Sequence, residues 1–582
     1  MAIFDKFRKS SAEEGATAPV ADEKGPQAVD PVATTEKIPV DTPDDSSPPS
    51  DNVSEDVQRG VQYVEAAAKA WSKPVLIWIF INIWLLYFVN AFQSAINYSL
   101  IPYVTSDFET HSLLSTIFIV ANSITAACYI PLSKILDLWG RAEGFLLMTI
   151  FATMGLVMMA ACKNLSTFCA AYVFYSLGFS GMTFCVDVLT ADASKLKNRG
   201  LAYAFTSSPY IITAFAGPEA AEDFYEKISW RWGFGAFSII FPVVAAPLYI
   251  VLKIQMRKAE KQGLVKHEST LGVILFAGGL TVFLLPFTLA STAPNGWKTD
   301  YIIAMIIVGF VVICIFLVYE WFWAPKPMLN FRFFADRSVV GTCLLSATYQ
   351  ISYYCWAYYF SSFLQVVNDL SMSHAGYIDN TFNVVSGVLL FIVGFAIRKT
   401  GYYKWLLYIA VPLYILAQGL MIYFRRPDQH FGYLIMCEVF ISIGGSIFII
   451  VQQVSILAVV DHQHVAAALA LIFVVGTTGG AIGAAISGSI WTNTFLKALK
   501  MYLPADVVAD EETLMLIYED LYAQLSYPAG DPIRHGIQKA YGYAQTRMLS
   551  AGTAFMVLAI VATLLMRNIN VRKNAQVKGT VF

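Results

Sequence analysis

The chain has 582 residues, of which 57% are hydrophobic and 14% are charged, and its formal net charge is −2. Soluble domains carry about a quarter charged residues, whereas the apolar residues here gather in blocks that approach the roughly 20 residues of a membrane-spanning helix. This composition argues against a soluble enzyme and against a nucleic-acid partner. The sequence also lacks a nucleotide-binding loop, a His-Glu-x-x-His pair and a nucleophile elbow, which argues against an ATP-driven pump and the common hydrolases.

Residues 1–70 differ in character from the rest of the chain. They are rich in Pro, Ser, Thr, Asp and Glu and contain no apolar core. This pattern excludes a signal peptide and predicts a largely disordered cytoplasmic tail. Only residues 52–70 have the spacing of a short helix.

Long apolar segments then recur to the end of the chain. They predict an all-α membrane protein with about fourteen transmembrane helices. Gly, Pro or Asn interrupts several of them, which membrane helices tolerate where a neighbouring helix or a cavity satisfies the backbone. The expected spans are 75–103, 113–137, 143–162, 166–191, 201–222, 232–253, 271–290, 301–323, 338–364, 376–397, 404–424, 432–458, 465–494 and 548–566.

The distribution of Lys and Arg sets the expected orientation. These residues are concentrated in the loops after even-numbered spans, for example at Lys195, Lys197 and Arg199. By the positive-inside rule, these loops and both termini are cytoplasmic. The segment 495–547 between the last two spans then lies outside. It is polar and rich in Tyr, a helical stretch is expected near 510–525, and a loop of this length is usually functional or disordered.

A charged motif occupies the loop between the second and third spans. Asp137, Gly140 and Arg141 resemble the Gly-x-x-x-Asp-x-x-Gly-Arg signature of the major facilitator superfamily, although Ser133 stands at the leading Gly position. A charge pair at helix ends can hold one conformation and break in another. These residues are therefore the expected cytoplasmic gate, and the alternative is an ordinary basic loop.

Carboxyl groups in or near the spans are candidates for proton coupling. Asp187 lies inside the fourth span, Asp192 at its cytoplasmic end and Glu438 in the twelfth span, and Asp379 is a further candidate. A carboxyl group in hydrocarbon is costly unless it faces a cavity or a partner, and transporters use such groups as proton relays. The alternative for Asp187 is a structural pair with a base such as Arg199.

Aromatic side chains in the ninth span suggest contact with a large amphipathic ligand. Tyr353, Trp356 and Phe360 share one face of an expected helix, and Tyr354 and Tyr358 form a second row. Aromatic side chains combine contact area with a polar group. They also fill protein cores and interface belts, so that alternative stays open.

Amide side chains in the first span are further candidates for ligand contact. Asn90, Gln93 and Asn97 follow one another at helical spacing. Amides in a spanning helix usually line a cavity or bond to another helix. Both roles are open from the sequence.

Several segments together resemble the fungal siderophore–iron transporter family of the major facilitator superfamily. The segments are 187–192 with 197–200, 205–210 with 216–218, 230–235, and 525–534 with 540–542. The resemblance extends from about residue 57 to residue 570. The last loop is its most specific part, because fourteen-helix drug exporters of the same superfamily lack it.

The resemblance implies proton-coupled import of ferric siderophores across the plasma membrane, or across an endosomal or vesicular membrane. It implies a six-helix bundle at 71–260, an extra helix pair at 261–335, a second bundle at 336–566 and a cytoplasmic tail at 567–582. It also implies that the long loop is an extracellular lid or binding element. The candidate residues there are Tyr527, Pro528, Arg534, His535 and Tyr541.

The expected partners are the ferric siderophore, protons and the lipid bilayer, with no cofactor. A hexadentate siderophore already saturates its iron, so the protein need supply no metal ligand. The eight Cys have neither disulfide-scaffold nor zinc spacing, although a Cys162–Cys169 bridge stays open. Spans 1, 2, 4, 5 and 9 hold no Lys or Arg away from their ends, which favours a neutral hydroxamate chelate, such as triacetylfusarinine C or ferrichrome, over a trianionic catecholate.

Three other functions stay open at this point. A fourteen-helix drug or metabolite exporter shares the superfamily signature, but it would not need the 495–547 loop. A glutathione–proton exchanger is known among divergent members of the same family. A nutrient receptor that has lost transport is the remaining alternative, although such proteins often carry longer cytoplasmic extensions than this one.

Overall fold

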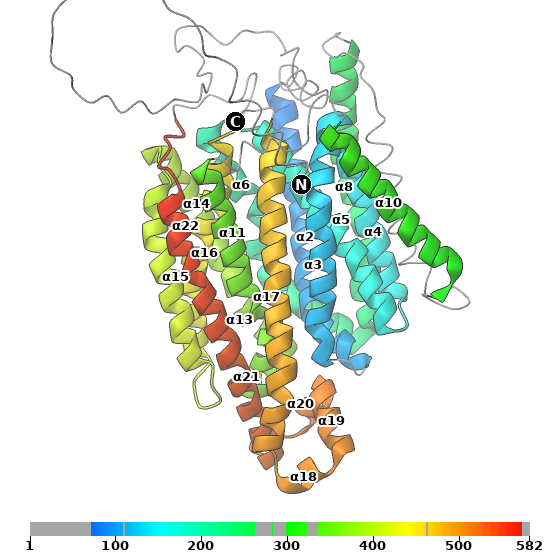
Figure 1. The fold of residues 1–582 in the computed structure, drawn as a ribbon, viewed down its shortest axis with the longest axis vertical. Helices are drawn as coiled ribbons and strands as arrows, with labels where there is room; N and C mark the ends of the chain where they lie inside the picture. The colour runs from blue at the N-terminus through cyan, green and yellow to red at the C-terminus, as the bar shows by residue number, and fades with distance from the viewer. Residues whose placement is uncertain are drawn as a thin grey trace, which may run out of the picture. The chain divides into compact units, whose positions relative to one another are not determined.

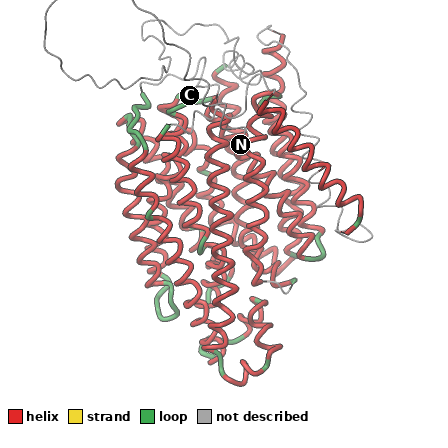
Figure 2. Tube along the Cα trace, in the orientation of Figure 1, coloured by secondary structure: helices red, strands yellow, loops and turns green. Residues whose placement is uncertain are grey.

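The computed structural model describes residues 72–108, 111–261, 282, 298–322, 336–460 and 464–572. Every regular element among these residues is helical (Figure 2). The elements are α2 (Lys73–Asp107), η1 (His111–Leu113), α3 (Leu114–Leu138), α4 (Arg141–Ala161), α5 (Leu165–Asp192), α6 (Leu196–Ser207), α7 (Pro209–Asp223), η2 (Phe224–Ile228), α8 (Trp230–Lys261), α10 (Asp300–Phe322), α11 (Arg337–Tyr354), η5 (Ala357–Tyr359), α12 (Phe360–Asn368), α13 (Met372–Asp379), α14 (Thr381–Thr400), α15 (Lys404–Phe424), α16 (Gly432–Leu457), α17 (Val465–Tyr502), α18 (Ala505–Ala509), α19 (Glu511–Glu519), α20 (Leu521–Ser526), α21 (Pro532–Met556) and α22 (Leu558–Leu565).

Ten helical segments among the described residues are long and apolar enough to cross a membrane. An unbroken helix satisfies its own backbone hydrogen bonds, which hydrocarbon requires. Three further predicted spans correspond to α6 with α7, to α10, and to α11 with α12. The all-helical membrane fold is thus confirmed, while the count of fourteen spans stays a prediction. The predicted tail helix at 52–70 and the predicted span at 271–290 lie outside the described residues.

Four of the predicted spans are interrupted by a break in the helix, and in the fourteenth Val557 separates α21 from α22. In the fifth span, α6 ends before Ser208 and Pro209 begins α7, because proline has no N–H to continue the hydrogen-bond ladder but fits the first turn of a new helix. In the ninth span, residues 355–359 separate α11 from α12. In the tenth span, Asn380 separates α13 from α14. Such breaks inside a membrane helix are tolerated where they line a cavity.

The described helices fall into two groups. Helices α2–α8 pack mainly among themselves, and α11–α17 pack with α21 and α22. The groups meet where α3 contacts α17, where α6 contacts α14 and where α7 contacts α13. Figure 1 shows α17 running beside α3 for most of its length. We call these sets the first and second helix groups.

A group of short helices lies at one end of the bundle, between α17 and α21 (Figure 1). We call residues 505–526, which form α18, α19 and α20, the cap. The segment between the two long helices is 503–531, which is narrower than the 495–547 expected from the sequence. Helix α17 continues to Tyr502, and α21 begins at Pro532, where the Asp531 side chain accepts a hydrogen bond from the Ile533 N–H. A polar sequence does not end a helix, so the helix ends differ from the ends of the polar segment, whose position outside the membrane stays a prediction.

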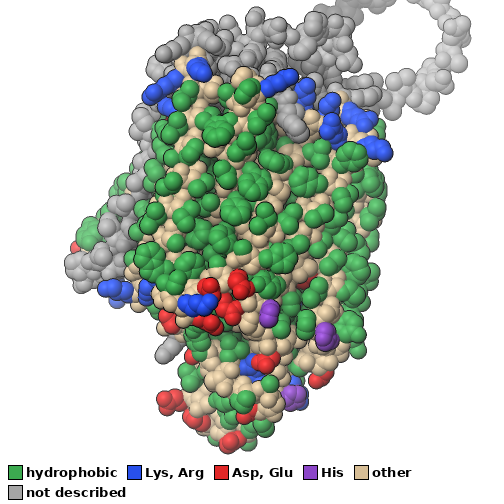
Figure 3. Space-filling view, turned by 180° about the vertical axis from the view of Figure 1, so that it is seen from behind, with side chains coloured by type: hydrophobic (Ala, Val, Ile, Leu, Met, Phe, Trp, Pro, Cys, Tyr) green, Lys and Arg blue, Asp and Glu red, His purple; other side chains and the backbone are tan. Residues whose placement is uncertain are grey.

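The surface of the bundle carries many exposed apolar side chains. Ile77, Ile239, Val243 and Phe310 are each more than half exposed. Figure 3 shows hydrophobic side chains spread over one face of the helices, with Lys and Arg gathered at the end opposite the cap. An apolar surface of this extent on a protein is explained by contact with lipid. The basic end agrees with the predicted cytoplasmic side.

Candidate functional site

Three cavities lie inside the bundle and are lined by both helix groups. The Asp187 chamber, about 250 Å3, includes Tyr87 and Gln453 in its lining. The Asp379 chamber, about 160 Å3, includes Tyr353. A third cavity, the tyrosine chamber, measures about 390 Å3. Its lining includes Tyr98, Tyr129, Tyr172, Tyr175, Tyr210, Tyr354 and Tyr358.

Tyr210 joins the three chambers, because its side chain belongs to the lining of each. It follows the Ser208–Pro209 break, where Trp84 Nε1 donates to the Ser208 hydroxyl at 2.9 Å. Its own hydroxyl accepts a hydrogen bond from Asn90 Nδ2 at 3.2 Å. The broken fifth span therefore places a phenol at the centre of the cavities, which hydropathy did not indicate.

Asp187 is held by residues from both helix groups. Its Oδ1 accepts a hydrogen bond from Tyr87 Oη at 2.7 Å, and its Oδ2 accepts one from Gln453 Nε2 at 3.3 Å. Tyr87 lies on α2 and Gln453 lies on α16. Among the described residues Asp187 forms no ion pair, and the predicted alternative partner Arg199 donates instead to the carbonyls of Ala191 and Ser194. A buried carboxyl with neutral partners can exist with or without its proton, as coupling requires.

The three amides of the first span have different environments. Asn90 lines the tyrosine chamber. Gln93 donates to the Asn90 side-chain oxygen at 3.3 Å and to the Ser94 hydroxyl at 2.9 Å. Gln93 and Asn97 are buried but line none of the three chambers. Asn90 thus faces the cavity, and Gln93 supports it from behind.

The aromatic residues of the ninth span keep the two expected rows, but only some of them reach a chamber. Trp356 lies 5.4 Å from Tyr353 and 5.6 Å from Phe360, measured between ring centroids. Tyr353 lines the Asp379 chamber, while Tyr354 and Tyr358 stack at 5.1 Å and line the tyrosine chamber. Trp356 and Phe360 are buried and line none of the three chambers, so their contact with a ligand stays a prediction.

The predicted gate forms a buried ion cluster. Arg141 Nη1 lies 2.9 Å from Asp137 Oδ1, and Arg141 Nε lies 2.9 Å from Asp192 Oδ2. Asp192, which the sequence suggests as a proton-coupling candidate, is thus a partner of the gate arginine. All three residues belong to the first helix group, so the cluster ties α3, α4 and α5 together within that group.

Gly140 sets the geometry of this ion cluster. It precedes α4 with φ +110°, a conformation that side chains other than glycine rarely adopt. A Cβ atom there would lie 2.8 Å from Met256 Cε. The glycine therefore lets the chain turn so that Arg141 enters the cluster.

The candidate loop residues divide into two sets. Arg534 and Tyr541 are buried and hold the cap, since Arg534 Nη1 donates to the Gln524 carbonyl at 2.6 Å and Tyr541 Oη donates to Gln524 Oε1 at 2.8 Å. Pro528 and His535 are exposed, and Tyr527 is partly exposed. None of these five lines a chamber. Their positions fit a lid more directly than a site inside the bundle.

Comparison with known proteins supplies the family. A model of the Major Facilitator Superfamily matches residues 83–337. The siderophore iron transporter mirB of Emericella nidulans is 57% identical over 547 residues, which cover 91% of this chain and 90% of that protein. The MFS siderochrome iron transporter 1 of Gibberella zeae is 53% identical over 558 residues, which cover 93% and 91%. The chain belongs to the fungal siderophore–iron transporter family of the major facilitator superfamily.

Comparison with a solved structure supports the same fold for this chain. A bacterial homologue of the human lysosomal transporter Spinster, in an inward-facing and unoccupied conformation, aligns with a TM-score of 0.52. The alignment covers 85% of this chain and 98% of that one, at 15% identity. The predicted major facilitator fold is confirmed.

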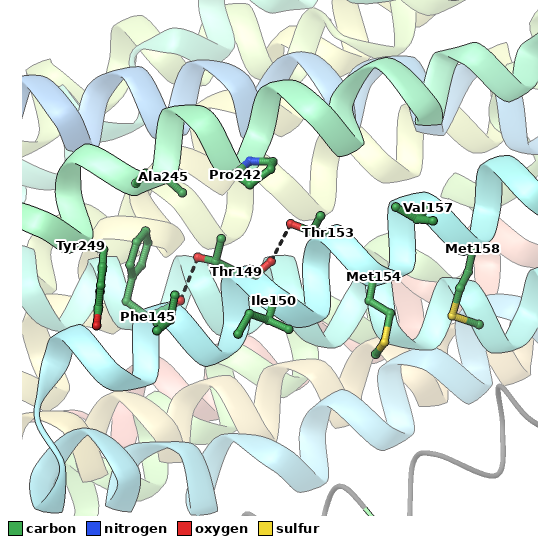
Figure 4. A pocket seen from close by; sticks show the side chains of 12 residues that line it. Phe145, Thr149, Ile150, Thr153, Met154, Val157, Met158, Pro242, Ala245 and Tyr249 are labelled. Carbon is green, nitrogen blue, oxygen red and sulfur yellow. Dashed lines mark hydrogen bonds between the residues drawn. The ribbon is translucent and has the colours of Figure 1, made fainter.

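A cavity larger than these three chambers lies outside the site. It measures about 570 Å3 and is a groove between α4 and α8 (Figure 4). Ile150 and Val157 on its wall are half exposed on the apolar surface. The hydroxyls of Thr149 and Thr153 donate to carbonyls of their own helix, so they are not free for a ligand. An apolar groove on the lipid-facing surface does not suit a polar iron chelate.

The sequence analysis did not single out several residues that line the chambers of this chain. Tyr87, Tyr210 and Gln453 were not singled out, although an amide pair at residues 452–453 inside an apolar span was a readable signal. Arg425 follows an expected span and reads as a loop base, yet it is fully buried. All eight Cys are free, so Cys162 and Cys169 form no bridge.

Proposed function

We propose that the chain imports ferric siderophores across the plasma membrane by proton symport. Its relatives are named siderophore and siderochrome iron transporters, and they match nearly the full length of the chain. The iron is cargo held by the siderophore, so recognition falls to groups that contact the organic shell. Membership of the family and the presence of internal chambers both support this proposal.

The charge of the chamber lining indicates which class of siderophore the chain transports. No Lys or Arg lines the three chambers, whose polar groups are mainly Tyr, Ser, Thr, Asn and Gln, with Asp187 and Asp379 as the acids. A trianionic ferric catecholate needs cations to replace its hydration. A neutral ferric hydroxamate, such as triacetylfusarinine C or ferrichrome, needs hydrogen bonds and aromatic contact, which tyrosines provide. We therefore assign hydroxamates as the substrate.

Asp187 is the proton-coupling residue in this proposal. As a carboxylate it accepts hydrogen bonds from Tyr87 of the first group and Gln453 of the second. Once protonated, it has a donor of its own and loses acceptor capacity, so one of these bonds must weaken. Protonation thereby changes a contact between the two groups, whose rocking is the transport movement expected of this fold.

The cap is the outer lid in this proposal. Glu519 of α19 accepts hydrogen bonds from the Ser112 N–H at 3.2 Å and from the Ser112 hydroxyl at 2.8 Å. Ser106 at the end of α2 accepts one from the Leu521 N–H at 3.1 Å. The cap, which continues from α17 of the second group, thus holds the first group by a few polar contacts that water can replace.

The test is uptake of radiolabelled iron in a yeast host without its own siderophore transporters or reductive iron uptake. Ferric hydroxamates and one ferric catecholate are supplied with and without a protonophore. We expect hydroxamate uptake that collapses with the protonophore, and at least a tenfold loss in Asp187→Asn. Asp506→Asn, an exposed cap residue, is the matched control and should keep full uptake.

Three results would overturn parts of this proposal. Absence of uptake at normal surface expression removes siderophore import, and drug sensitivity or a glutathione efflux defect on deletion would then favour export or exchange. Catecholate uptake equal to hydroxamate uptake removes the substrate assignment. Full uptake by Asp187→Asn with unchanged protonophore sensitivity removes Asp187 as the coupling residue.

A further inference from the structure

Arg425 is a buried cation without a close carboxylate. It follows α15 at the cap end and is 0% exposed. Its guanidinium carbon lies 3.9 Å from the Phe360 ring centroid and 4.4 Å from that of Trp356. Its Nη1 donates to Gln545 Oε1 at 3.1 Å, and among the described residues it forms no ion pair within 4.0 Å. The charge rests mainly on aromatic faces and one amide.

Two carboxyl groups act electrostatically on this guanidinium. Glu438 of α16 is 2% exposed, and its Oε1 has no hydrogen-bond partner. Asp379 at the end of α13 is partly exposed and lines the Asp379 chamber. The other titratable groups that face Glu438 are Tyr98, Tyr349, Tyr353, Tyr414 and, on its own helix, Cys437.

Unpaired polar atoms are concentrated around this arginine. Besides Glu438 Oε1, the buried atoms without a hydrogen-bond partner include Arg425 Nε and Trp356 Nε1. Folded proteins leave few such atoms unpaired, because each costs free energy. Unpaired atoms on Arg425, on the Trp356 side chain beneath it and on the Glu438 carboxyl that acts on it indicate a second arrangement in which Arg425 and Glu438 pair.

We propose that Arg425 and Glu438 form a proton-controlled switch on the broken ninth span. In the arrangement seen here, Arg425 lies on Trp356 and Phe360, and we assign this arrangement to the protonated, neutral form of Glu438. When Glu438 releases its proton to water, the carboxylate draws the guanidinium off the rings into an ion pair. Protonation reverses the exchange, and no other group is oxidised or reduced.

The position of the two rings connects this switch to the chamber wall. Trp356 and Phe360 flank η5, and Tyr353, Tyr354 and Tyr358 of the same segment line the chambers. Tyr98 of the first helix group donates to the Ala357 carbonyl at 3.0 Å. Removing the guanidinium from the rings frees this segment to shift. The proton state of Glu438 thereby changes both the lining and a contact between the groups.

The switch rests on the proposed symport, and two transport modes separate the two ideas. In proteoliposomes, accumulation of a ferric hydroxamate is driven by an inward proton gradient, whereas exchange of labelled for unlabelled chelate at equal pH needs no net proton movement. We expect the Glu438→Gln variant to exchange chelate at a rate within twofold of wild type. Its proton-driven accumulation of chelate should fall at least tenfold. Glu512→Gln, exposed on the cap, is the matched control and should keep both.

A spectroscopic measurement tests the switch without transport. Removal of the stacked guanidinium changes the surroundings of the Trp356 indole, so the wild-type chain should show a pH-dependent component of tryptophan fluorescence. This component should disappear in Trp356→Phe and in Glu438→Gln, and it should return with a shifted midpoint in Glu438→Asp. Glu438→Asp also serves if Glu438→Gln fails to fold.

Opposite outcomes have distinct meanings. The switch is overturned if a folded Glu438→Gln variant accumulates the chelate as the wild type does. It is also overturned if the substitution leaves the fluorescence titration unchanged. Either result leaves the symport intact. A wild-type chain that neither exchanges nor accumulates ferric hydroxamates overturns the proposed function instead. The fluorescence titration still decides the Arg425–Glu438 exchange in that case.

Discussion

Arg534 holds the cap to the second helix group, and Arg534→Met should release it. The guanidinium donates to three backbone carbonyls, those of Gln524 at 2.6 Å, Val366 at 3.0 Å and Gln365 at 3.2 Å. Methionine fills similar space but donates nothing, so three buried carbonyls lose their partner. Only the Gln524 bond joins Arg534 to the cap, because Val366 and Gln365 belong to α12, and a hydrogen bond to a charged group contributes about 1.5–3 kcal/mol. Since 1.4 kcal/mol is a tenfold change, cap opening should rise by about tenfold to a hundredfold.

Hydrogen–deuterium exchange in detergent or nanodiscs measures this opening directly. Amides of residues 511–526 should exchange about tenfold to a hundredfold faster in Arg534→Met, while those of α4 and α5 keep the wild-type rate, because local opening involves the cap alone. Arg547→Met on the same helix is the matched control. Arg547 is exposed and stacks on Tyr543, so its loss should leave the cap unchanged. Wild-type exchange in the cap of Arg534→Met would refute the role assigned to the arginine.

Three further predictions concern the ends of the first helix group. Gly140→Ala forces alanine into φ +110° and should destabilise the chain by about 1–3 kcal/mol, seen as a lower melting temperature in detergent, whereas Gly235→Ala, whose new Cβ meets nothing closer than 3.6 Å, should not. Asp192→Asn leaves the buried Arg141 with one carboxylate and should also lower the melting temperature and abolish uptake; an unchanged melting temperature would contradict the ion cluster. Burial lowers the pKa of His111, which lies between α2 and α3, to about 4. The unfolded histidine takes up its proton near pH 6.5, so stability should fall as pH drops from there towards 4, by roughly 2 kcal/mol at pH 5, and His111→Gln should lack this component.

Elements governed by hydropathy alone were predictable from the sequence. Helices such as α4, α15 and α16 lie within a few residues of the expected spans, because a long apolar block in lipid has to be helical. The pairing of Asp137 with Arg141 was also predictable, since a four-residue separation at helix ends brings the charges together. These predictions depend only on local sequence.

Features that depend on contacts between distant segments were not predictable. The row of Tyr353, Trp356 and Phe360 was expected, but the contact of Arg425 with the last two rings was not. Arg425 itself reads as a loop base, because burial by α12 and α21 has no local signal. The pairing of Asp192 with Arg141 likewise depends on packing between helices. Spacing in the sequence predicts which residues are neighbours on one helix. Contacts between helices depend on packing, which spacing does not predict.

The break in the ninth span also suggests why cavity shape and group movement are linked. A break frees backbone groups that hydrocarbon cannot satisfy, so other side chains must pair with them. Ala357 O takes its partner, Tyr98 Oη, from the opposite helix group, whereas Tyr359 O takes Gln545 Nε2 from its own. When the groups rock, the first bond must exchange while the second can persist. The wall that carries Tyr354 and Tyr358 is therefore anchored to one group and sensitive to the other, so substrate contact and group movement cannot be independent.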